Sequence, residues 1–166
     1  MNTKENLKTA FAGESQANRK YLAFAQQAER DGYPVIAGLF RAVAEAETIH
    51  AHTHLRNLGG IGDTLTNLKE ALAGEEYEVT EMYPGMVATA EAEGAQRASL
   101  GMRYALEVEK VHGALFRQAI AALSGGKDLA ADSFHICPVC GHTEFGPPPE
   151  RCPVCNAKGS SYIAIR

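Results

Sequence analysis

The stretch FRAVAEAETIHAHTH, residues 40–54, places Glu47 and His50 three positions apart. Phe40 lies on the same seam at 100° per residue, so both polar side chains are expected among apolar neighbours. Three positions on a helix differ by about 60° in direction and one turn in height, so an acid and a histidine can reach one point. His54, one turn further on, is expected to be a core histidine or a donor to a metal ligand. The stretch therefore supplies one acid and one histidine that could reach the same metal ion inside a helical bundle.

The same spacing recurs in residues 105–116, ALEVEKVHGALF, where it joins Glu109 to His112. A single Glu-x-x-His is usually a coincidence on a solvated helix face, but two such pairs on core-facing seams favour a shared function. Glu45 and Glu107 point about 160° away from these seams and are expected to be surface acids.

Three further acids fall on inward stripes: Glu14, where a leucine is expected, and Glu78 and Glu81 in a third segment. Several ionised groups facing a core would each cost several kcal/mol unless cations neutralise them. Carboxylates with one imidazole per metal suit iron or manganese better than zinc or copper, and iron is our prediction. One Glu on each of two helices and Glu-x-x-His on two others is the layout of ferritin-like di-metal bundles.

The helical pattern covers residues 1–126 and predicts an all-α four-helix bundle. Segments rich in Ala, Glu, Leu and Lys, separated by glycine-containing breaks, are expected over residues 3–30, 34–58, 64–94 and up to 124. Pro84 lies inside the third segment, where it predicts a kink or a helix boundary.

A different composition begins after residue 126, with residues 127–133 as a linker and 134–166 as a small module. All four cysteines form two Cys-Pro-Val-Cys pairs: Cys137, Cys140, Cys152 and Cys155. About 34 residues bury too little apolar surface to fold without a staple, and four thiolates around one metal would provide it. Zinc and iron both suit four sulfurs. The neighbouring di-metal bundle favours iron, because iron carries an electron and zinc does not.

Composition narrows the function classes. The 166-residue chain is 45% hydrophobic with a net charge of −4, and it has no block of like charges. Neither nucleic acid nor a membrane is therefore an expected partner. No apolar run of about 18 residues or signal-peptide core is present, which predicts a cytoplasmic protein.

Together these motifs resemble the rubrerythrin family over nearly the whole chain. They are Phe11-Ala-Gly-Glu14-Ser-Gln-Ala, Glu47-x-x-His50, Glu78-x-x-Glu81-Met-Tyr-Pro, Glu109-x-x-His112 and the two cysteine knuckles. The resemblance implies that Glu47 and Glu109 bridge two irons. It also implies that Glu14 and Glu81 bind one iron while Glu78 and His112 bind the other. His50 would be the redox-dependent ligand that replaces Glu81 on reduction.

The implied activity is reduction of hydrogen peroxide to water, in defence against oxidative stress. Electrons would pass through the rubredoxin-like iron centre from an external donor, either rubredoxin or an NAD(P)H-linked reductase. The resemblance also implies a homodimer in which the module of one subunit serves the di-iron site of the other, and it leaves open whether helices are exchanged. The two cysteine knuckles are closer together than in free-standing rubredoxins, so the resemblance does not predict the redox potential of the four-cysteine iron. The alternatives are a ferroxidase or iron-storage protein, and a binding protein stapled by zinc.

Overall fold

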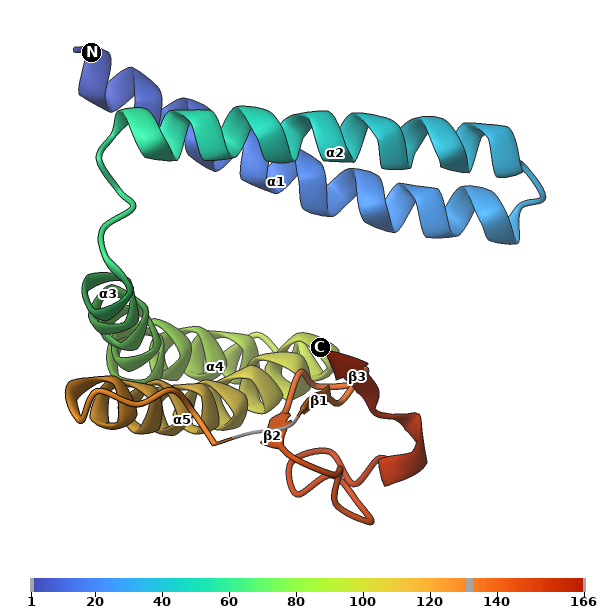
Figure 1. Cartoon of the computed structure of the whole chain (residues 1–166). Helices are drawn as coiled ribbons and strands as arrows, with labels where there is room; N and C mark the ends of the chain where they lie inside the picture. Colours follow the sequence, from blue (N-terminus) through green and yellow to red (C-terminus); the bar gives the residue numbers. More distant parts are fainter. Residues whose placement is uncertain (1, 131–132, 166) are drawn as a thin grey trace. The chain divides into compact units, whose positions relative to one another are not determined.

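The computed structural model describes residues 2–130 and 133–165 and is mostly helical (Figure 1). Its helices are α1 (Thr3–Arg30), α2 (Pro34–Asn57), α3 (Thr64–Tyr77), the π-helix η1 (Glu78–Met82), α4 (Tyr83–Ala92), α5 (Gln96–Ser124) and the 3-10 helix η2 (Gly159–Ser161). The strands are β1 (Phe134–Ile136), β2 (Thr143–Phe145) and β3 (Ile163–Ile165). The four predicted helical segments are confirmed, the third as the composite α3–η1–α4. The predicted linker, residues 127–133, lies partly outside the described residues.

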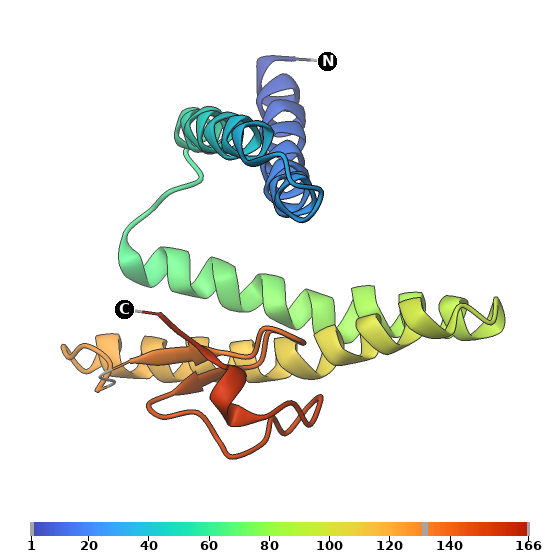
Figure 2. The same ribbon diagram turned by 90° about the vertical axis from the view of Figure 1, so that its right-hand side faces the viewer.

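The chain divides into two compact units, Met1–Gly62 and Asp63–Arg166. The first unit is the helical hairpin α1–α2, whose helices run side by side in both views (Figures 1 and 2). A capping box at Asn2 starts α1, and Gly32 adopts a φ of 83° in the turn, a conformation that other residues rarely adopt. Pro34 then opens α2, where its missing N–H costs nothing.

Small residues allow close packing within the hairpin. Ala25, Ala28 and Ala37 are buried together, with Phe40 packed against them. Asn18 of α1 donates to the carbonyl of Ala44 on α2 at 2.7 Å. Burial of these methyl groups and this cross-helix hydrogen bond fix the rotation of α1 against α2.

In the second unit, α3, η1 and α4 form one long interrupted helix packed on α5. Asp63 caps α3 by accepting a hydrogen bond from Thr66 N at 2.8 Å. The interruption that Pro84 predicts is confirmed, since Pro84 lies in the first turn of α4 directly after η1. Tyr83 N donates to Glu78 O, the i to i+5 bond of a π-helix.

The C-terminal module, also in the second unit, is a three-stranded antiparallel sheet in the order β2-β1-β3. Thr143 starts β2 and pairs with Ile136. The loop before β2 lies close to α5, since a methyl group at Gly141 would come within 3.8 Å of the buried Val108. None of the helices formed by the described residues is both long and apolar enough to cross a membrane.

Candidate metal centres

The hairpin carries one cluster of potential ligands. Glu14 of α1 and Glu47 and His50 of α2 place one ligand atom each within 4.8 Å of one another. His50 Nδ1 lies 3.0 Å from Glu47 Oε2. A hydrogen bond between the two carboxyls raises the pKa of Glu14 and lowers that of Glu47, and His50 lowers the pKa of Glu47 further. A cation between the two carboxyls would let both ionise.

His54 lies beside this cluster. Its Nδ1 atom is buried and has no hydrogen-bond partner among the described residues. Buried polar atoms are normally hydrogen-bonded, so this nitrogen needs an explanation. Because the neighbouring side chains are potential metal ligands, the explanation they favour is a bound ion or a water molecule on that ion.

The second unit carries another cluster, formed by Glu75 of α3 with Glu109 and His112 of α5. His112 Nδ1 lies 2.7 Å from Glu109 Oε2 and 3.9 Å from Glu75 Oε2, so this nitrogen faces the carboxylates. Glu75 and Glu109 also line a cavity of about 560 Å³ together with Glu81. Burial, then the charge of Glu109, raises the pKa of Glu78. Glu78 and Glu81 therefore border the cluster without being among its three members.

Glu75 was not predicted. The sequence nevertheless contains a signal for it, because Glu75, Glu78 and Glu81 follow one another at intervals of three. Burial raises the pKa of Glu75 to about 8, and its hydrogen bond and repulsion with Glu109 add to the effect. A pair of carboxyls held this close is stable with one proton between them, or with a cation in its place.

This raised pKa predicts a pH-dependent stability of the metal-free protein. Because the folded-state pKa of Glu75 lies above its ordinary value of 4.5, the folded state holds a proton more tightly than the unfolded state. Stability is thus lost as the pH rises from about 5 to about 8. Glu75→Gln removes the ionisation, so we expect it to raise the free energy of unfolding relative to wild type at pH 8.5 and much less at pH 5.

Urea unfolding of chelator-treated protein at both pH values measures this difference. Glu76→Gln is the matched control, since Glu76 is an exposed neighbour paired with Arg117 at 2.7 Å. An unchanged pH dependence in Glu75→Gln would contradict the electrostatic account.

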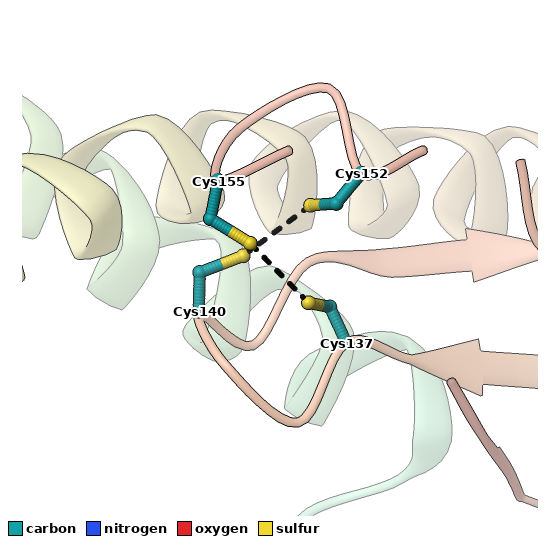
Figure 3. A group of neighbouring side chains, drawn as sticks. All are labelled: Cys137, Cys140, Cys152 and Cys155. Carbon is teal, nitrogen blue, oxygen red and sulfur yellow. Dashed lines mark hydrogen bonds between the residues drawn. The ribbon is translucent and has the colours of Figure 1, made fainter. Parts of the chain in front are cut away.

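The four cysteines converge on one point, as Figure 3 shows. The Sγ atoms of Cys137 and Cys155 lie 3.6 Å apart and those of Cys140 and Cys152 lie 3.5 Å apart, and each cysteine is free of disulfide bonds. Four sulfurs at about 2.3 Å from a central metal would be separated by about 3.8 Å, so the cage fits a tetrahedral thiolate site.

Local hydrogen bonds prepare one of these thiols to ionise. Burial alone would raise the pKa of Cys152, but hydrogen bonds from Tyr162 and from the backbone N–H groups of Cys155 and Val154 lower it to about 6. Burial raises the pKa of Cys140 and Cys155. Only a cation in the centre would make all four thiolates stable together, which fits the predicted metal.

The structure thus brings together five of the seven predicted carboxylate and histidine ligands in two clusters, places Glu78 and Glu81 beside the second, and gathers all four cysteines. Two carboxylates and one imidazole in each cluster are a donor set that suits iron. The four-sulfur cage suits iron or zinc.

The comparisons with known proteins likewise separate a helical part from a C-terminal cysteine module. The family model described as Rubrerythrin matches residues 5–120, and the one described as Rubrerythrin, rubredoxin-like domain matches residues 135–162. Among curated relatives, Rubrerythrin-2 of Clostridium acetobutylicum is 35% identical, over 98% of this chain and 96% of its own. Nigerythrin of Nitratidesulfovibrio vulgaris is 36% identical, over 98% of this chain and 86% of its own.

A solved structure of nigerythrin, described as fully reduced and all ferrous, is similar to this chain with a TM-score of 0.59 and 33% identity. The similarity covers 99% of this chain and 87% of nigerythrin. The carboxylate and histidine clusters are therefore candidates for a di-iron site, and the four cysteines form a rubredoxin-like site. With family models that match residues 5–120 and 135–162, and with relatives similar over nearly the whole length, the chain belongs to the rubrerythrin family.

Proposed function

We propose that this protein is a non-haem di-iron peroxidase that reduces hydrogen peroxide to water in oxidative stress defence. One observation carries the proposal. His112, in a cluster of ligand-type side chains, lies 3.1 Å from Thr143, which follows Cys140 of the four-sulfur cage by three residues. A site able to carry single electrons therefore lies in the same compact unit as part of a site able to hold a redox metal.

The proposed ligands of the two irons are Glu14, Glu47, His50, Glu78, Glu81, Glu109 and His112. Bound iron would supply electrons and Lewis acidity at this centre. Glu47 and Glu109 would bridge, as family membership suggests, and each lies within 3.0 Å of the histidine three residues later. Glu81 and His50 would alternate as ligands, so that negative charge leaves the site when the metal charge falls.

The overall reaction consumes one peroxide, two protons and two electrons, and it yields two waters. Hydrogen-bonded carboxyl groups whose pKa values move apart, such as Glu14 and Glu47, can hold and release a proton at the site. Electrons would come from an external donor, either rubredoxin or an NAD(P)H-linked reductase, through the four-cysteine iron. We further propose that the protein works as a homodimer.

The first experiment combines metal analysis with anaerobic spectroscopy on protein purified without added metal. We expect about three irons per chain, two in the bundle and one in the four-cysteine site. A visible thiolate–iron band should bleach with dithionite and return with excess peroxide, since full reoxidation of three ferrous irons consumes about 1.5 equivalents. Zinc in the cage with no peroxide-dependent change would contradict the peroxidase. A large cage that oxidises iron with oxygen would instead support iron storage.

A further inference from the structure

The side chain of His112 is held from both sides. Its Nδ1 atom lies 2.7 Å from Glu109 Oε2, and its Nε2 atom lies 3.1 Å from the hydroxyl oxygen of Thr143. Thr143 belongs to β2, so the imidazole ring of His112 on α5 contacts a residue of the cysteine module. Both elements lie in the unit Asp63–Arg166.

The direction of the hydrogen bond between His112 and Thr143 follows from a further neighbour of Thr143, the carbonyl oxygen of Gly141. Thr143 Oγ1 lies 3.2 Å from the carbonyl oxygen of Gly141, which can only accept, and when the hydroxyl donates there only its lone pairs are available to His112. In this arrangement Nε2 carries the hydrogen and donates it to Thr143. Nδ1 is then left with a lone pair directed at Glu109 and Glu75, which is the tautomer that a metal ligand needs. Two acceptors 2.7 Å apart repel each other unless a cation or a proton lies between them.

Apolar side chains around the hydrogen bond between His112 and Thr143 strengthen it. Phe116, Phe134 and Phe145 line an apolar cavity of about 470 Å³ that also borders His112 and Thr143. A hydrogen bond beside such a lining is electrostatically stronger than one in water. The module also fixes Thr143 itself, which pairs with Ile136 in the sheet and follows the buried His142.

We propose that Thr143 is a positioning residue, whose hydroxyl accepts the Nε2 hydrogen of His112 and so fixes the tautomer and ring orientation of a ligand in the carboxylate centre. Outer partners of ligating histidines commonly perform this task. The contact also connects the two metal centres, because Gly141, which accepts from Thr143, is bonded to Cys140. This inference rests on the proposed role of His112 as a ligand.

The test uses full-length protein with Thr143→Val, which removes the hydroxyl and keeps the side-chain shape, and Thr143→Ser, which keeps the hydroxyl. Zinc serves as a diamagnetic probe. With the four-cysteine site first filled with zinc, chelator competition for the additional zinc measures the affinity of the carboxylate centre, and ¹⁵N-edited NMR follows the Nε2 hydrogen of His112. We expect Thr143→Val to weaken zinc binding by about 10-fold or more and to expose the Nε2 hydrogen to rapid solvent exchange. Thr143→Ser should match wild type in both respects.

Three results decide the matter. Wild-type affinity and slow exchange in Thr143→Val would overturn the inference, and so would equal weakening in both variants, because that would indicate packing. His112→Ala separates this inference from its premise. If His112→Ala binds zinc normally, the ligand assignment itself is wrong. If His112→Ala loses the site while Thr143→Val keeps it, only the role of Thr143 fails.

Discussion

Glu109→Gln is expected to reduce peroxide turnover to below about 1% of the wild-type rate, because it removes the charge on which the second cluster depends. Glu109 contacts His112 at 2.7 Å, and its charge raises the pKa of both Glu75 and Glu78. An amide keeps the shape but cannot neutralise a cation. Steady-state peroxide consumption and iron content per chain measure the effect.

Glu107→Gln is the matched control, two residues away on the same helix. Glu107 is exposed and pairs with Lys110 at 2.6 Å, so its loss should leave turnover near the wild-type rate. The thiolate–iron absorption of the module should be intact in both variants. Normal turnover in Glu109→Gln would remove Glu109 from the proposed ligand set.

Cys140→Ser should abolish donor-dependent turnover, because it breaks the metal cage that holds the module together. Structural zinc sites in small peptides contribute about 10–16 kcal/mol of apparent binding free energy at pH 7, and strands of three residues offer no comparable source of stability to this module. We expect loss of the thiolate–iron band and faster proteolysis within residues 134–165. The bundle should still react once with peroxide after chemical reduction, since all its proposed ligands are retained, but it should hold metal more weakly because the contact from Thr143 to His112 is lost.

Val139→Ala provides the control within the same knuckle. Val139 is 62% exposed and offers no ligand atom, so its truncation should preserve the absorption band and the turnover. Undiminished donor-dependent turnover in Cys140→Ser would show that electrons reach the carboxylate centre without the four-cysteine site.

Much of the fold was predictable because local signals and packing agree. The predicted span of residues 3–30 is α1 as observed, since polar caps and a glycine–proline turn mark its ends. Pro84 correctly predicted an interruption. The winding of residues 78–82 as a π-helix was not predictable, because a periodicity of 100° per residue presupposes an α-helix. The directions predicted for the Glu78 and Glu81 side chains from an α-helical period therefore do not apply within this π-helix.

The same limit explains the incomplete prediction of the second cluster. Glu109 and His112 lie on an uninterrupted helix, where spacing converts directly into direction, and the structure brings them together. Glu75 joins them from the last turn of α3, just before the helix changes its winding. Its role depends on how α3 packs against α5, which no pattern within one helix contains. The cysteine cage was easier, since two knuckles of fixed spacing can close on only a few arrangements.

The π-helix η1 also bears on how the chain tolerates changes in length. A turn closed by the bond from Tyr83 N to Glu78 O holds one residue more than an α-helical turn. Loss of one residue from a regular helix such as α5 would rotate everything beyond it by about 100° and turn core side chains outward. Loss of one residue within η1 could instead be absorbed by closing the wide turn, with α3 and α4 left in register. Glu78 and Glu81 thus lie in a segment that can lose one residue without disrupting α3 or α4.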